Sequence, residues 1–190
     1  MKRQSLGLLT VGLFVLIAIA AVLLYFFGPG RRGVQTASQS PIIGKAQLGK
    51  PAPQFEVATT NGLFDLSKAE KPVFLEVFAT WCPHCQRETA VVDRLYGKYR
   101  NSIDFVAVSG SDTAMDGTST SSQADVLEWT RRFKVVYPVA YDPLLNVANL
   151  YLQGGYPTFA IIGRNKDVAY LESGEVSYDD LDAAIAKALR

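Results

Sequence analysis

The chain has 190 residues, 48% of them hydrophobic and 11% aromatic, with only two cysteines. This apolar content excludes a disordered chain, because enough surface can be buried to offset the entropy of ordering. Two cysteines are too few for a disulfide-stapled scaffold or a four-thiolate metal site. Residues 1–50 hold six basic side chains and no acidic one, so residues 51–190 carry 13 basic against 18 acidic, a net charge of −5. A negative folded part argues against a nucleic-acid-binding protein.

An uninterrupted apolar run, LGLLTVGLFVLIAIAAVLLYFF, covers residues 6–27 and follows a short basic N-terminus at residues 1–5. A helix of this length spans roughly 33 Å at about 1.5 Å per residue, which is enough to cross a bilayer core of about 30 Å. A cleaved signal peptide has a shorter apolar core, of about 7–15 residues. The run therefore predicts a transmembrane helix acting as a signal anchor, with cleavage and a buried soluble helix as alternatives.

Residues 28–50 are rich in Gly, Pro, Ser and Gln and have neither helical nor strand periodicity. This composition is typical of a flexible linker, which would keep the domain at residues 51–190 close to the bilayer.

Within that domain, apolar runs of strand length alternate with segments of helical spacing. The expected elements, in chain order, are a strand at 73–79, a helix at 83–100, a strand at 103–109, a short helix at 126–133, a helix begun by Asp142-Pro143 and ending near 151, two hairpin strands at 158–163 and 167–171, and a helix capped by Ser177. Strands that alternate with helices predict an α/β fold, with a sheet covered by helices on both faces.

Both cysteines lie in the segment Trp81-Cys82-Pro83-His84-Cys85, between the first strand and the first helix. The N-terminus of a helix presents unpaired N–H groups and a positive dipole, which lower the pKa of a thiol. We expect Cys82 to be the attacking thiolate and Cys85 the resolving thiol. His84 adds a potential positive charge beside Cys82, and Pro83 suits an early helical position.

Other uses of a CxxC pair fit less well. A zinc site needs two further ligands, but His84 is the only histidine and there is no third cysteine. Covalent haem attachment requires a histidine directly after the second cysteine, where Gln86 stands. An inert buried pair is not typical of a strand-to-helix corner. The context favours redox chemistry with no metal and no bound cofactor other than the cysteine pair.

Several motifs together resemble the thioredoxin-like superfamily, and more narrowly the membrane-anchored TlpA/ResA group of thiol–disulfide oxidoreductases, which is related to the AhpC/TSA redoxins. They are Pro51-Ala52-Pro53-Gln54-Phe55, the strand Phe74–Ala79, the segment 80–85, and Gly155-Tyr156-Pro157-Thr158. The resemblance implies a thioredoxin fold with a central four- or five-stranded mixed sheet and an N-terminal extension. It also implies that Cys82 is the nucleophile, that Cys85 resolves the mixed disulfide, and that Pro157 is a cis-proline beside them.

Around this pair, the expected substrate contacts are Trp81, Pro83, His84, Tyr156, Pro157 and Thr158. Tyr156 departs from the group, which usually carries a smaller residue before the proline.

Two carboxylates complete the predicted site. Glu76 interrupts an apolar strand six residues before Cys82, and burying a carboxylate costs several kcal/mol unless it is paired or protonated. It matches the buried acid of thioredoxins, so we expect it to transfer protons to and from Cys85. Glu88 matches an acid of the TlpA/ResA group, with a solvated charge near the helix start as the alternative.

These patterns predict a bacterial membrane-anchored oxidoreductase with its domain outside the cytoplasm. Its expected partners are protein thiols or disulfides, with apocytochrome c as one candidate, and a membrane protein that recycles it. We expect its reduction potential to lie above that of thioredoxin, about −270 mV. The alternatives are a thiol peroxidase of the AhpC/TSA type and a copper carrier using Cys82, Cys85 and His84.

Overall fold

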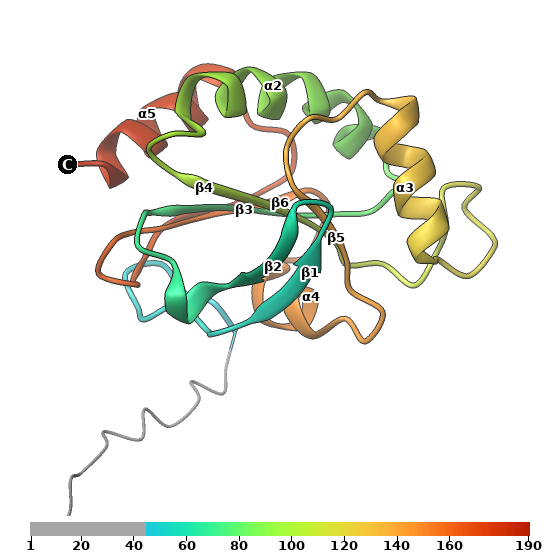
Figure 1. Cartoon of the computed structure of the whole chain (residues 1–190), viewed down its shortest axis with the longest axis horizontal. Coiled ribbons are helices and arrows are strands. Elements are labelled where there is room, and N and C mark those ends of the chain that lie inside the picture. Colours follow the sequence, from blue (N-terminus) through green and yellow to red (C-terminus); the bar gives the residue numbers. More distant parts are fainter. Residues whose placement is uncertain (1–44) are drawn as a thin grey trace, which may run out of the picture. The chain divides into compact units, whose positions relative to one another are not determined.

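A seven-stranded mixed sheet with the strand order β2-β1-β5-β4-β3-β6-β7 organises the domain (Figure 1). The computed structural model of the chain describes residues 45–190. The strands are β1 (Glu56–Thr59), β2 (Gly62–Asp65), β3 (Val73–Phe78), β4 (Asp104–Ser109), β5 (Val139–Tyr141), β6 (Thr158–Ile162) and β7 (Val168–Ser173).

Strand β3 lies near the middle of this sheet and is buried at all six positions. It pairs in parallel with β4 on one side and antiparallel with β6 on the other. A run of Val, Phe and Leu suits this place, because both faces of a central strand are covered. The sheet therefore holds the end of β3, where the cysteine segment begins, in a fixed position.

Helices cover both faces of the sheet (Figure 1). They are α2 (Pro83–Tyr99), α3 (Gln123–Arg132), α4 (Asn146–Tyr151) and α5 (Tyr178–Ala188), with a short 3-10 turn η1 (Leu66–Lys68). One apolar core joins α2, α3 and α5 to the sheet through residues such as Phe78, Leu95 and Trp129. The other core joins α4 to the opposite face through Leu75, Val77 and Tyr151. The α/β architecture predicted from the sequence is confirmed.

The sheet is wider than the four or five strands that the resemblance implies. The hairpin of β1 and β2 extends it, because Thr59 at the end of β1 pairs with Ala140 of β5. We did not predict this hairpin, whose two-residue turn is Thr60-Asn61.

The helix expected to begin at Asp142-Pro143 begins only at Asn146. Leu145 has a left-handed backbone conformation (φ 54°), so the chain between 142 and 145 is a turn. The Asp142 carboxylate still caps the helix, accepting the N–H groups of Asn146, Val147 and Ala148 at 2.9, 2.8 and 3.1 Å. By contrast, the capping of α5 by Ser177 is confirmed, since its side chain accepts the N–H of Asp180.

Contacts of the domain begin before residue 51, within the segment expected to end the linker. Ala46 is buried, and its N–H donates to Leu150 O at 2.7 Å. Lys50 O accepts the N–H of Val168 at 2.9 Å. The transmembrane helix predicted at 6–27 lies outside the described residues. Within residues 45–190, no helix is both long and apolar enough to cross a bilayer.

Candidate active site

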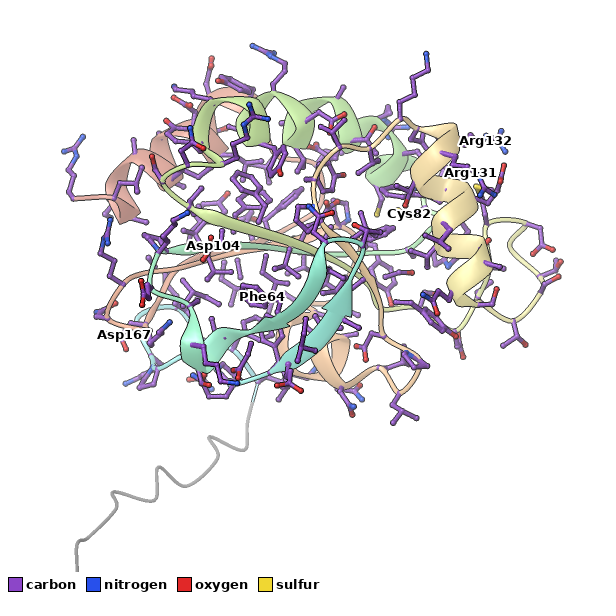
Figure 2. The ribbon with its side chains drawn as sticks, in the orientation of Figure 1. Phe64, Cys82, Asp104, Arg131, Arg132 and Asp167 are labelled. Carbon is purple, nitrogen blue, oxygen red and sulfur yellow. The ribbon has the colours of Figure 1, made fainter. Side chains whose placement is uncertain are left out.

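The two cysteines lie where β3 is followed by α2. Cys82 is the N-cap residue of α2 and Pro83 its first residue, a position that suits the fixed φ of proline. The Cys82 N–H donates to Ala79 O at 3.1 Å, and the Cys82 carbonyl accepts the N–H of Gln86 at 3.1 Å. Figure 2 shows Cys82 at the end of α2 next to α3. An anion at this position is stabilised by the positive end of the helix dipole.

The loop before β6 contacts Cys82 directly. The peptide bond between Tyr156 and Pro157 is cis, as the resemblance to thioredoxin-like proteins implied. The Cys82 thiol donates to the Tyr156 carbonyl, with 3.6 Å between Sγ and O. The structure thus brings Cys82, Tyr156 and Pro157 together from segments more than 70 residues apart in the chain.

Two aromatic side chains form a rim beside Cys82. Trp81 is 37% exposed, and its Nε1–H donates to Ser111 Oγ at 2.9 Å. Its ring meets the ring of Tyr156 edge to face, with centroids 6.0 Å apart. The Tyr156 hydroxyl donates to Gly110 O at 2.5 Å. Both rings are therefore held in place, and Trp81 stays partly open to solvent beside Cys82.

Cys85 and Glu76 are buried below this rim. Cys85 has no exposed surface, and burial, with the nearby Glu76 carboxyl, raises the pKa of its thiol well above the ordinary value. Glu76 is fully buried in β3, and neither of its carboxyl oxygens has a hydrogen-bond partner. Burial is the larger cause and the charge of Glu88 the next, and together they raise the pKa of Glu76 to about 8. A neutral thiol and a neutral acid therefore share the interior at neutral pH.

A third buried group, the hydroxyl of Tyr137, lies beside Glu76. The nearby Tyr137 hydroxyl partly offsets the rise in the pKa of Glu76, although the two groups are not aligned for a hydrogen bond. Burial raises the pKa of Tyr137 itself well above its usual value. Tyr137 was not predicted as a site residue, because it belongs to no motif of the sequence.

Glu88 is 5% exposed and does not behave as a solvated charge. Its Oε1 accepts the N–H of Val176 at 3.1 Å, and its Oε2 is buried without a partner. Burial raises the pKa of Glu88, while the Val176 N–H opposes that rise. Glu88 thus joins α2 to the segment that precedes α5.

His84, between the two cysteines, is exposed and contacts an acid from that same segment. Its Nδ1 lies 2.9 Å from Glu175 Oε2, and the Arg87 Nε donates to Glu175 Oε1 at 2.5 Å. Neither Glu175 nor Arg87 was predicted, since they lie 88 residues apart and no local pattern connects them.

Thr158 lies next to the cis-proline, but its side chain is buried. Its hydroxyl donates to Gly155 O at 2.8 Å and accepts the N–H of Gln153 at 3.1 Å. These bonds hold the turn before β6, so the side chain of Thr158 has a structural place rather than an open surface for substrate. Within the described part of the chain, no group of three or more His, Cys, Asp or Glu side chains could hold a metal ion.

Comparisons with known proteins agree with this arrangement. The family model described as Redoxin matches residues 47–188. The thiol-disulfide oxidoreductase ResA of Bacillus cereus is 28% identical over 148 residues, which cover 75% of this chain and 79% of that protein. The ResA of Geobacillus kaustophilus is 27% identical over 188 residues, covering 95% of this chain and 94% of that protein.

Solved structures share the fold. One from Chlorobium tepidum TLS, a thiol:disulfide interchange protein of the thioredoxin family, has a TM-score of 0.58 and 25% identity, covering 76% of this chain and 99% of that one. StoA from Bacillus subtilis has a TM-score of 0.58 at 18% identity, covering 72% of this chain and 98% of that one.

Proposed function

The chain belongs to the redoxin family, and from this membership and the geometry of its cysteine pair we propose that it is a thiol–disulfide oxidoreductase of the thioredoxin-like ResA/TlpA type. The observation that carries the proposal is the position of Cys82. Cys82 is the N-cap residue of α2, and its thiol contacts the carbonyl before the cis-proline. A second thiol, that of Cys85, lies one helical turn away.

The first step is attack on a substrate disulfide. The Cys82 thiolate forms a new S–S bond to one substrate sulfur, and the other substrate sulfur leaves as a thiolate. The helix N-terminus stabilises the attacking thiolate. The backbone at Tyr156 and Pro157, with the rim of Trp81, is the surface on which an extended substrate would lie.

The second step resolves the mixed disulfide. Cys85 transfers its proton to the ionised form of Glu76 and attacks Cys82 Sγ, which forms the Cys82–Cys85 disulfide and releases the second substrate thiolate. Two electrons have then passed from the protein dithiol to the substrate disulfide, and the reverse sequence oxidises a substrate dithiol. Glu76 suits the proton transfer because its raised pKa, about 8, lies near the working pH.

Direction depends on the reduction potential. A positive charge at His84 would stabilise the Cys82 thiolate and therefore the reduced form, which makes the disulfide more oxidising. We propose a potential above that of thioredoxin, about −270 mV.

Membrane anchoring is part of the proposal. The apolar run at 6–27 would hold the protein in the bacterial cell membrane in a single pass, with residues 28–44 as a tether and the domain outside the cytoplasm. Extracytoplasmic protein thiols or disulfides, apocytochrome c among them, would be its substrates. A membrane redox protein would recycle it, and the cysteine pair itself would serve in place of a bound cofactor.

Equilibration with glutathione tests the proposed activity. In this reaction the protein disulfide and two glutathione thiols give the protein dithiol and glutathione disulfide. We expect the full-length chain to form one internal disulfide reversibly, with a potential above about −270 mV, and the variants Cys82→Ala and Cys85→Ala to form none. A chain that forms no internal disulfide is not an oxidoreductase of this kind. A value at or below −270 mV contradicts the proposed direction alone.

A further inference from the structure

The last residue of β7 and the loop that leads to α5, together called the 173–177 loop, contact both the cis-proline turn and the cysteine-bearing helix. The N–H of Gly174 donates to Pro157 O at 2.8 Å, and the Ser173 hydroxyl donates to Gly155 O at 3.1 Å. On its other side, the N–H of Val176 donates to Glu88 of α2. The 173–177 loop is therefore fixed against the cis-proline turn and against the cysteine-bearing helix.

Glu175 extends from this loop to the first turn of α2. One of its oxygens faces His84 Nδ1 at 2.9 Å, and the other accepts Arg87 Nε–H at 2.5 Å. The Arg87 Nη2 also lies 2.8 Å from His84 Nδ1. The contact of Glu175 with Arg87, and then that with His84, lower the pKa of Glu175 to about 2, so the carboxylate is charged.

Both side chains lie near the start of α2, of which Cys82 is the N-cap residue. His84 is two residues from Cys82, and the charge of Arg87 acts on it. Glu175 first, and a thiolate at Cys82 in addition, raise the pKa of the Arg87 guanidinium. His84 Nδ1 is engaged with the carboxylate, while the hydrogen bond of the Cys82 thiol is to Tyr156 O.

We propose that Glu175 is a positioning residue that sets the reduction potential of the Cys82–Cys85 pair. Its carboxylate neutralises part of the positive charge that Arg87 presents to the Cys82 thiolate, and so makes the protein less oxidising than it would be without this acid. This inference rests on the proposed oxidoreductase function and names the residue that tunes it.

The sign of the effect follows from counting charges. Glu175 contributes one negative charge beside the Arg87 guanidinium. Replacing it with Gln removes that charge, so the pair formed by Arg87 and residue 175 becomes more positive by one charge. A more positive group stabilises the thiolate, favours the reduced form and raises the potential.

The test compares reduction potentials in glutathione buffers for the full-length wild type and three variants. Glu175→Gln should shift the exchange equilibrium toward the reduced protein by about threefold to tenfold, the size expected when one charge is removed from a partly solvated site. That change corresponds to roughly 14 to 30 mV. Arg87→Gln removes a positive charge and should shift the equilibrium in the opposite direction. Added salt should reduce both shifts, because the three side chains are partly exposed.

Glu172→Gln is the matched control. Glu172 is an exposed acid three residues from Glu175 and has no hydrogen bond or ion pair through its side chain in the described residues. We expect its potential to equal that of the wild type. The inference is overturned if Glu175→Gln shifts the potential no more than Glu172→Gln does, or shifts it downward. Since the wild type exchanges disulfides in either case, such a result leaves the proposed function intact.

Discussion

At the scale of single residues, the site is defined by groups that burial forces to keep their protons. Glu76 has no exposed surface and no hydrogen-bond partner, and it lies beside a buried thiol at Cys85. A charged carboxylate in such a place is costly, so the proton stays on Glu76 until about pH 8. Glu76 therefore becomes able to accept a proton only close to physiological pH.

The burial of Glu76 predicts a pH dependence of stability. The folded protein keeps its proton up to about pH 8, whereas the unfolded chain loses it near 4.5. The folded state thus binds an extra proton between these values. The contribution of Glu76 to the free energy of unfolding should fall as pH rises across this window, by about 1.4 kcal/mol per pH unit. Glu76→Gln should remove this loss, which urea unfolding at pH 5.0 and 8.5 can measure.

In that experiment Glu76→Gln should be more stable than wild type by only about 1 kcal/mol at pH 5.0, because this pH lies just half a unit above the pKa of 4.5 in the unfolded chain. At pH 8.5 the variant should be more stable by up to several kcal/mol. An unchanged difference between the two pH values would show that Glu76 is not protonated in the folded protein.

Glu76 should also control the resolving step. Once the mixed disulfide is formed at Cys82, Cys85 must lose a proton to attack it, and Glu76 is the buried base beside it. We expect Glu76→Gln to slow this step about 10²-fold or more, and to abolish its increase with pH toward 8. Rapid-quench mass spectrometry of the mixed disulfide with glutathione measures the rate. A variant that resolves it at the wild-type rate excludes Glu76 as the base.

At the scale of elements, short polar contacts decide where helices begin. The Asp142 carboxylate accepts three N–H groups of α4, which has only six residues. A helix this short depends on its cap. We predict that Asp142→Ala lowers the free energy of unfolding by about 1–2 kcal/mol, measured by urea unfolding.

The matched variant is Asp142→Asn, whose amide oxygen still accepts one or two of these bonds and should lose less stability. Equal losses in the two variants would indicate that the carboxylate charge, and not the capping bonds, stabilises α4.

A second contact joins α2 to the 173–177 loop. Glu88→Ala leaves the buried N–H of Val176 without an acceptor, which should cost about 1–3 kcal/mol. Glu88→Gln keeps an acceptor and should cost less in the same urea titration. If Glu88→Ala is neutral, the contact does not hold the loop on α2.

How far the sequence predicts these elements depends on the range of the signals. The buried strand β3, the helix α2 and the cap of α5 follow from local patterns, so they were predicted. The start of α4 was not, because the left-handed Leu145 lets Asp142 cap the helix from four residues before its first residue. The β1–β2 hairpin joins the sheet through pairing of Thr59 with Ala140, a contact that no local pattern describes.

At the scale of the whole molecule, the candidate site is assembled from three distant segments. The end of β3 and the start of α2 supply the cysteines, the turn before β6 supplies Tyr156 and Pro157, and the 173–177 loop supplies Glu175. The first two segments carry motifs and could be predicted. Glu175 could not be predicted, because only the fold brings this loop residue next to His84 and Arg87, and no local sequence pattern connects them.

The central claim is that Cys82 attacks and Cys85 resolves, because Cys82 is the N-cap residue of α2 and is 4% exposed, whereas Cys85 lies within the helix with no exposed surface. The most direct measurement is incubation of reduced full-length Cys85→Ala and Cys82→Ala with glutathione disulfide, followed by mass spectrometry of each cysteine. We predict a stable mixed disulfide at Cys82 in the first variant and almost none at Cys85 in the second. Modification of Cys85 as fast as that of Cys82, or no adduct in Cys85→Ala, would contradict the account.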